Sequence, residues 1–284
     1  MREVPEGDAR TIRIAPPHGW GFPNLVELWH ARELVYFLIW RDIRVRYKQT
    51  MLGVAWMVLQ PLATVLVFSL FFGQLLRVPS GDVPYPIFAF AGLVPWSYFA
   101  ASLARATGSL VANAGLLTKV YFPRLAIPLS AVLGGLVDAA IALCVLAILM
   151  VFYGVPLHAS ALLAIPLLLL AAVTALGFGL WLGALNVRYR DVGQVVPFLV
   201  QIWMYLTPVV YGSTLIPERF RFLLGLNPMT VVVEGFRWAL LGSESPAASM
   251  PLWVLGTSFA LVLLILLTGS VFFRRVEKGF ADVV

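Results

Sequence analysis

Four cations close together precede the first long apolar segment, and the chemistry open to them is anion binding. Arg41, Arg44, Arg46 and Lys48 lie directly before the apolar residues 51–76. Guanidinium and ammonium groups bind phosphate oxygens, and cations beside a membrane span are attracted to anionic lipids and resist translocation. We therefore expect this cluster to hold one end of a membrane span on the cytoplasmic side.

Asp138 is the one carboxylate that falls in the middle of a predicted span. An ionised Asp at that depth costs about 3 kcal/mol, so its side chain should face the bundle interior and pair, or be protonated. The residue is either a proton or cation site or part of a helix-to-helix hydrogen bond. No second ionisable group is expected beside it within the membrane to form a relay, which favours the structural interpretation.

No motif for enzyme chemistry accompanies these residues. Lys48, Lys119 and Lys278 are the only lysines and none follows a glycine, so the chain has no Walker A loop for ATP. The hydrolase elbow, the zinc-protease helix and the dinucleotide fingerprint are also missing. The histidines lie far apart, and the only cysteine, Cys144, has no disulfide partner. We expect no catalytic residue, cofactor or metal in this chain.

The composition indicates an integral membrane protein. Hydrophobic residues make up 61% of the 284 residues, charged residues make up 12%, and the mean hydropathy is +0.90. These values lie far from the balance of a soluble domain. The net charge of +6 does not indicate nucleic-acid binding, because the cations lie at the ends of apolar runs and form no polar basic face.

Six segments are apolar and long enough to cross a bilayer as helices, which takes roughly 20 residues each. They are residues 52–76, 85–103, 125–153, 161–185, 192–211 and 252–273. The sequence predicts an all-α integral membrane protein whose six-helix transmembrane domain covers residues 51–273. Residues 1–23 and 274–284 are expected to be cytoplasmic tails.

The distribution of cations sets the orientation of these spans. The predicted cytoplasmic side carries the cations through Lys48 and then Arg105, Lys119, Arg124, Arg188, Arg190, Arg274, Arg275 and Lys278. The other side carries only Arg77, Arg219, Arg221 and Arg237. Under the positive-inside rule, this asymmetry places both termini in the cytoplasm.

Residues 24–50 are predicted to form an amphipathic helix that lies in the membrane interface. Asn24 suits an N-cap with Glu27 as its reciprocal partner, and apolar residues recur at helical spacing as far as Ile43. The apolar run 34–40 is too short to span a bilayer. Its aromatic side chains should face the lipid tails and its arginines the headgroups.

Residues 212–250 are apolar but are interrupted by proline, glycine and charge, so they are not a lipid-facing span. Asn227 suits an N-cap, Pro217 and Pro228 suit first turns, and Gly225 and Gly242 suit C-caps. The segment therefore predicts two short helices that dip into the outer leaflet or roof the bundle.

Residues 113–124 connect the second and third spans on the predicted cytoplasmic side. They begin with Asn113, become apolar, and are broken by Pro123. A short amphipathic helix in this place would dock into the groove of a partner protein. The alternative is an interfacial turn.

Aromatic residues are dense in three of the predicted spans. They include Trp56, Phe68, Phe71, Phe72, Tyr98, Trp203, Tyr205 and Tyr211. Interfacial belts and lipid-facing packing are the usual roles of such residues. The alternative is a channel lining, in which flat rings stack on the C–H faces of sugars and let a long glycan slide past.

Five ordered segments carry recognisable motifs. They are RDIRVRYKQTMLG at 41–53 with Trp56 and QPL at 60–62, GLVPW at 92–96, KVYFPR at 119–124, NVRYRDV at 186–192, and LNPM at 226–229 with EGFR at 234–237. From residue 40 to the C-terminus the chain resembles the permease subunits of type-2 ABC exporters for polysaccharides. Several motifs in order are more specific than any one alone.

The resemblance implies a homodimeric channel above two separate ATPase subunits, which would bind the ATP and Mg²⁺. The cargo would be a lipid-linked polysaccharide crossing the bacterial inner membrane, with O-antigen expected and capsule or teichoic acid as close variants. Residues 24–48 would be the interface helix, 113–124 the coupling helix and 212–250 the periplasmic gate. The first and fifth spans would meet across the dimer.

The resemblance also implies roles for particular residues. Contact with the ATPase falls to Leu116, Leu117, Thr118, Lys119, Val120, Tyr121, Phe122, Pro123 and Arg124. The diphosphate of an undecaprenyl-linked glycan would meet Arg41, Arg44, Arg46 and Lys48, for which topology anchoring is the alternative use. The aromatic residues named above would line the channel. Arg219, Asn227, Pro228, Glu234 and Arg237 would form the gate.

Three other functions stay open. The first is an ion-coupled secondary transporter that uses Asp138. The second is an intramembrane lipid-modifying enzyme, for which paired catalytic carboxylates or histidines would be expected and none is found. The third is a type-2 ABC exporter of drugs or small lipids.

Overall fold

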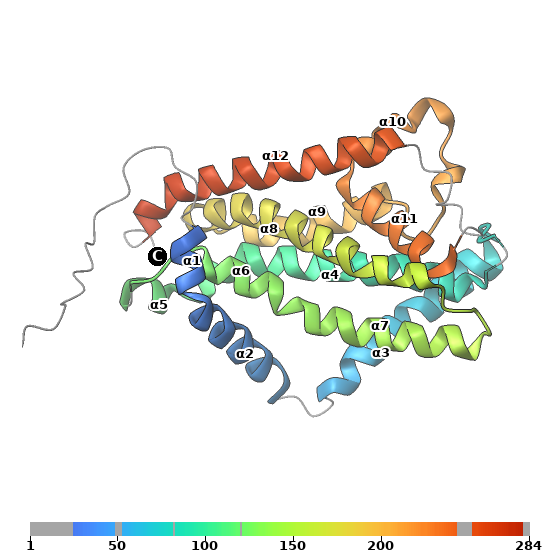
Figure 1. Cartoon of the computed structure of the whole chain (residues 1–284), viewed down its shortest axis with the longest axis horizontal. Coiled ribbons are helices and arrows are strands. Elements are labelled where there is room, and N and C mark those ends of the chain that lie inside the picture. Colours follow the sequence, from blue (N-terminus) through green and yellow to red (C-terminus); the bar gives the residue numbers. More distant parts are fainter. Residues whose placement is uncertain (1–24, 49–52, 82, 120, 243–251, 281–284) are drawn as a thin grey trace, which may run out of the picture.

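The protein is an all-helical bundle, as the sequence predicts. A computed structural model describes residues 25–48, 53–81, 83–119, 121–242 and 252–280, and every regular element in these ranges is a helix. The long helices run side by side along the molecule (Figure 1). We call the end with α1, α5 and residue 280 the α5 end, and the end with α10 and α11 the α11 end.

Five helices are long and apolar enough to cross a membrane in the described residues: Val58–Leu75, Tyr85–Ala112, Ala126–Phe152, Ala159–Arg188 and Trp253–Val276. The predicted span 192–211 is shorter, because α9 covers only Val192–Leu206. Thr207 is extended, the conformation that a following proline imposes, and Pro208 follows it. The sixth crossing therefore stays a prediction.

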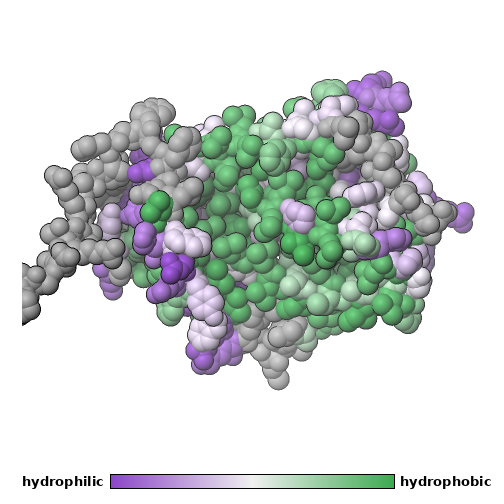
Figure 2. Space-filling view, viewed as in Figure 1, coloured by the Kyte–Doolittle hydropathy of each residue, from purple (hydrophilic) through white to green (hydrophobic). Residues whose placement is uncertain are grey.

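Helix α4 (Tyr85–Ala112) is the centre of the bundle. Among the most apolar 18 residues of α4, 78% are buried. The corresponding share is only 6% for residues 58–75, which belong to α3 (Gly53–Phe68) and its π-helical continuation Ser69–Leu75. Around α4 pack α6 (Ala126–Leu133), α7 (Gly135–Phe152), α8 (Ala164–Arg188), α9 and α11 (Pro228–Leu241). The apolar surface crosses the middle of the molecule, and hydrophilic residues gather towards its ends (Figure 2), as a bilayer requires.

Glycines let α8 approach its two neighbours closely. A Cβ on Gly179 would lie 2.6 Å from the Cβ of Ala106 in α4, and one on Gly177 would lie 3.1 Å from Ile265 in α12 (Leu252–Val276). Small residues at such positions favour tight packing between membrane helices, where no hydrophobic effect drives association. Helices α4 and α12 thus both pack closely on α8.

The N-terminal helix is bent, whereas the sequence predicted one helix over residues 24–48. Its parts are α1 (Leu25–His30) and α2 (Arg32–Lys48), with Ala31 in a turn. Hydrogen bonding continues through the bend, because Ala31 N donates to Glu27 O at 3.1 Å. The predicted cap at Asn24 lies outside the described residues.

A second packed cluster joins the elements at the α5 end. It contains Val35, Leu38, Leu110, Leu117, Ala126, Ile127, Leu180, Ala184, Val187, Phe273 and Phe280. The rings of Phe273 and Phe280 meet edge to face at 5.4 Å, and Phe280 is buried. The described part of the predicted tail 274–284 is therefore packed on the bundle through Phe280.

The segment after α9 contains the 3-10 turns Ser213–Leu215 and Glu218–Phe220, then α10 (Phe222–Leu226) and α11. Asn227 caps α11, Pro228 occupies its first turn, and Gly242 ends it with a φ of 75°, all as predicted. Gly225 was expected to be a C-cap, but it lies inside α10. Most of α11 is buried against α4 and α8, so it packs within the bundle.

Candidate functional site

The predicted coupling segment forms a short helix that is packed on one side and exposed on the other. It is α5 (Ala114–Lys119), in which Leu117 belongs to the packed cluster of the α5 end while Thr118 and Lys119 are exposed. Tyr121 is 72% exposed, and Val120 lies outside the described residues. An exposed edge backed by a packed Leu suits contact with another protein.

Two contacts tie this segment to the rest of the α5 end. The Arg41 guanidinium of α2 donates to Asn113 Oδ1 at 2.7 Å, directly before α5, and it also pairs with Asp42 at 2.7 Å. The Arg124 guanidinium, directly after the segment, lies 5.9 Å from the centre of the Phe280 ring. Residues of α2 and α5 and Phe280 thus share one packed cluster, so α5 is tied to the rest of the α5 end.

Asp138 does have ionised partners in the bundle, contrary to the prediction that it is alone. Its Oδ2 accepts from Arg46 Nη1 at 2.6 Å and from Arg105 Nη1 at 3.3 Å. The prediction failed because the second span was ended at residue 103, whereas α4 continues to Ala112 and includes Arg105. We call Arg46, Arg105 and Asp138 the inner cluster.

The inner cluster is only partly buried. The side chains of Arg46 and Asp138 are 31% exposed and that of Arg105 is 26% exposed. Arg105 also donates to Ser102 Oγ at 3.2 Å, and a Cβ on Gly135 would overlap its guanidinium. The missing side chain at Gly135 therefore gives Arg105 its place against α7.

The other predicted phosphate-binding residues are placed differently. The guanidinium of Arg44 lies 4.4 Å from the centre of the Trp40 ring, in cation–π contact. Lys48 is exposed at the end of α2. Together with the contacts of Arg41, this leaves Arg46 as the member of the predicted set that reaches into the bundle.

The predicted channel aromatics fall into three groups. Trp56, Phe71 and Tyr205 are exposed, at 58%, 56% and 54%. Phe68, Phe72, Trp203 and Tyr211 are partly buried. Tyr98 is only 3% exposed and donates its hydroxyl to Val132 O at 3.2 Å, so it lines no surface of this chain.

Trp203 and Asn227 connect α9 to the start of α11. The Trp203 ring meets Phe99 and Phe178 edge to face at 5.1 and 5.0 Å, and its Nε1 donates to Asn227 Oδ1 at 3.0 Å. Asn227 Oδ1 also accepts from Met229 N at 3.1 Å. One amide thus caps α11 and holds it against α9.

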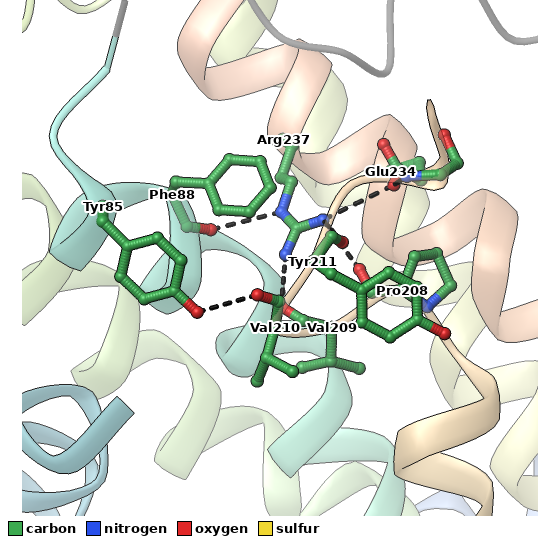
Figure 3. Close-up of polar contacts among 9 residues, drawn as sticks. Tyr85, Phe88, Pro208, Val209, Val210, Tyr211, Glu234 and Arg237 are labelled. Atoms are coloured by element: carbon green, nitrogen blue, oxygen red, sulfur yellow. Dashed lines mark hydrogen bonds and ion pairs between the residues drawn. The ribbon is translucent and has the colours of Figure 1, made fainter. Parts of the chain in front are cut away.

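Arg237 of the predicted gate is fully buried and bonded to backbone carbonyls (Figure 3). Its guanidinium donates to Phe88 O at 3.2 Å and to Pro208 O at 2.7 Å. It also donates to Tyr211 O at 3.1 Å and, at close range, to Val209 O. These bonds fasten the loop between α9 and α10 to α4.

Four further contacts surround Arg237, and we call Arg237, Glu234, Phe88 and Tyr85, with the loop residues they bind, the outer cluster. Glu234 lies 3.5 Å from Arg237 and accepts from Ser213 N at 3.0 Å. The Phe88 ring centre lies 3.9 Å from the guanidinium carbon, and the Tyr85 hydroxyl donates to Val210 O at 2.7 Å. Burial raises the pKa of the Glu234 carboxyl, and Arg237 opposes that shift. Arg219, by contrast, is exposed and stacks on Phe220 at 4.8 Å.

The sequence did not reveal that Gly92 serves this cluster. A Cβ there would lie 2.6 Å from Arg237 Nη2 and 2.7 Å from Val209 O, so only glycine fits. The signal available was that GLVPW and EGFR both belong to the ordered motifs, but nothing in one sequence says that two motifs meet. No group of three acidic, histidine or cysteine side chains in the described ranges could hold a metal ion.

A buried central helix surrounded by apolar helices is the architecture of a multi-pass membrane protein. Residues 33–241 match the ABC-2 type transporter family, and the chain belongs to this family. It is a multi-pass protein of the inner membrane and, like permeases of this type, it works with a separate ATPase. The resemblance found in the sequence motifs is confirmed.

Its relatives include permeases named for export of polysaccharides. The chain is 31% identical to the O-antigen export system permease protein RfbA of Myxococcus xanthus over 90% of this chain and 97% of the relative. It is 32% identical to RfbA of Klebsiella pneumoniae over 72% and 79%. It is 26% identical to the polysialic acid transport protein KpsM of Escherichia coli over 72% and 80%.

Proposed function

We propose that this chain is the channel-forming subunit of an ATP-driven exporter that moves lipid-linked polysaccharide, O-antigen in the first place, from the cytoplasm to the periplasm. Two copies would form the channel on two ATPase subunits, which bind the ATP and Mg²⁺. The names of the relatives that cover most of this chain support the cargo. The cation-rich α5 end would face the cytoplasm, with both termini there.

The observation that carries the mechanism is the packed cluster at the α5 end. Leu117 of α5 shares that cluster with Val35 and Leu38 of the interface helix and with Phe280. When ATP closes the nucleotide-binding dimer, the grooves holding the two α5 helices would approach each other. A packed interface passes such a shift on as a rigid displacement. The exposed aromatics of α3 and α9 would then line the channel between the two copies.

The test is purification of this chain with the ATPase encoded beside it, followed by ATPase assays in lipid nanodiscs. Lipid-linked O-antigen should stimulate hydrolysis, and Leu117→Ala should reduce that stimulation, while the matched control Leu162→Ala, at an exposed leucine beside α11, keeps it. Failure of any ATPase to associate in mild detergent would disprove the proposal. Equal stimulation by drugs or short lipids would indicate a type-2 exporter of small molecules.

A capsular polysaccharide is the second candidate cargo, favoured by the likeness to KpsM. The two candidates differ in the outcome of a deletion strain. Loss of O-antigen with intact capsule supports the first, and the reverse result supports the second. Teichoic acid would be tested in the same way.

A further inference from the structure

The chain turns back onto the bundle after its last long helix. Helix α12 ends at Val276, and the 3-10 turn Glu277–Gly279 follows it. This stretch is charged, with Arg274 and Arg275 directly before the turn, and such charges by themselves favour the membrane surface. Phe280 is nevertheless only 1% exposed. A fully buried ring beside so many charges needs contacts that hold it in place.

Two residues that contact the Phe280 ring belong to different parts of the chain. The ring of Phe273 in α12 meets it edge to face, with 5.4 Å between the two ring centres. The guanidinium carbon of Arg124 lies 5.9 Å from the centre of the Phe280 ring, within the distance of a cation–π contact. Both kinds of contact are favourable. Phe280 therefore joins the end of α12 to the last residue of the predicted coupling segment 113–124.

The coupling segment depends on contacts of this kind, because its own helix is short. Helix α5 has six residues, and an isolated helix of fewer than about 12 residues is marginal in water. The start of the segment is held by the bond from Arg41 to Asn113 Oδ1 at 2.7 Å. Its end is held by the contact of Arg124 with Phe280. The place of α5 is therefore set by Leu117 in the packed cluster and by the contacts at the two ends of the segment.

We infer that Phe280 is a positioning residue, which holds the end of the coupling segment where the ATPase meets it and connects that segment to α12. The inference rests on the proposed function, since it gives a residue outside the segment a part in transmitting the closure of the ATPase. Helix α12 in turn packs closely on α8, because a Cβ on Gly269 would lie 2.6 Å from Gly177 O. Through Phe280, a shift of the segment would reach α12 and α8 as well as the interface helix.

Packing of the α5 end is the other role open to this ring, and one substitution separates the two roles. Phe280→Leu keeps an apolar side chain in the cluster but removes the ring contacts with Arg124 and Phe273. Packed cores tolerate the exchange of one large apolar side chain for another. A role in packing alone would therefore survive in Phe280→Leu, whereas a positioning role that acts through Arg124 would not.

The first test measures ATP hydrolysis by the whole exporter in nanodiscs, with and without lipid-linked O-antigen. Phe280→Leu should reduce the stimulation by the cargo about fivefold, the lower end of the usual coupling between two sites, and should leave the basal rate unchanged. Phe259→Leu is the matched control, because Phe259 is 55% exposed on the same helix, and it should change neither rate. Full stimulation in Phe280→Leu, or an equal loss in both variants, would overturn the inference.

The second test follows the coupling segment directly and does not depend on the cargo. A nitroxide label at Tyr121→Cys, where the side chain is 72% exposed, reports the motion of the segment once Cys144→Ala has removed the only native cysteine. Phe280→Leu should increase the mobility of the label, and so should Arg124→Gln, which removes the other partner of the contact. Phe259→Leu should leave it unchanged. Equal mobility in all these chains would overturn the inference. Absence of stimulation in the unmodified exporter contradicts the proposed function instead, and the mobility of the label then still decides the role of Phe280.

Discussion

Two arginine clusters lie along α4, and they differ in burial more than in chemistry. The outer cluster begins at Phe88 and the inner one includes Arg105, which are about 25 Å apart along the helix. Arg237 is 0% exposed and spends its donors on backbone carbonyls. The side chains of Arg46 and Arg105 are 31% and 26% exposed and share one carboxylate oxygen.

The difference separates a structural ion pair from an exchangeable one. Breaking a buried pair costs about 3–5 kcal/mol, because a charge is left without compensation. An exposed pair contributes only about 0–1 kcal/mol. The outer cluster is therefore part of the fold that holds the loop between α9 and α10, whereas the ion pairs of the inner cluster contribute little to stability.

The largest effect is expected for Arg237→Ala. It leaves Glu234 buried without its cation and several carbonyls without a donor, so the free energy of unfolding should fall by about 3–5 kcal/mol. Unfolding in SDS micelles, followed by circular dichroism, measures this change. The exposed Arg219→Ala serves as control and should change stability by less than about 0.5 kcal/mol. Equal losses in both variants would remove the distinction between buried and exposed arginines.

A smaller effect is expected for Gly92→Ala, which adds a methyl group against the same guanidinium. Overpacking of this kind costs about 1–3 kcal/mol. Gly108→Ala is a matched control on the same helix, because nothing lies within 4 Å of the Cβ built there. That variant should be neutral or stabilising by up to about 1 kcal/mol. The cost of Gly92→Ala should shrink in an Arg237→Ala background, and an unchanged cost would show that Val209 O alone excludes the methyl.

Asn227→Ala should lower the free energy of unfolding by less than Arg237→Ala does and by more than a change in the inner cluster does, because Asn227 is partly buried. Loss of a helix N-cap costs about 0.5–2 kcal/mol, and Trp203 Nε1 loses its acceptor as well. Intrinsic Trp fluorescence during unfolding reports the change. Asn227→Asp keeps an acceptor oxygen for both donors and should recover most of the loss. If the Asp variant is as unstable as the Ala variant, the cap is not what holds α11 to α9.

Local chemistry made part of this architecture predictable. The cap at Asn227, the first-turn Pro228 and the C-cap Gly242 follow from rules about single helix ends, and all three are confirmed. The apolar runs likewise predicted five of the segments that are long and apolar enough to span, although the second was ended nine residues before Ala112 and the π-helical turn Ser69–Leu75 of the first was not predicted. Gly225 was assigned wrongly, because α10 continues through it to Leu226.

The contacts between motifs were not predictable from one sequence. Arg237 bonds carbonyls 26 to 149 positions away, and no local pattern specifies such partners. Arg105 was placed outside the membrane because a charge normally ends an apolar window. The helix tolerates Arg105 because the carboxylate of Asp138 from α7 pairs with that charge inside the bundle. A hydropathy average along the sequence contains no information on contacts between helices. It therefore ends a predicted span at a charged residue even where a residue of another helix balances that charge.

The smallest effect is expected for the inner cluster, and it tests the comparison most sharply. A double-mutant cycle with Arg46→Ala and Asp138→Ala should give a coupling energy below about 1 kcal/mol, because both side chains are partly exposed and Arg105 remains as a second partner. The same unfolding assay measures it.

The coupling energy between Arg46 and Asp138 should also fall as the salt concentration is raised, because exposed charges are screened. The coupling energy between Arg237 and Glu234, measured in the same way, should barely respond. A coupling of about 3 kcal/mol that resists salt would be typical of a buried pair. Asp138 would then be as fixed as Glu234, and the two clusters would not differ in the strength of their ion pairs.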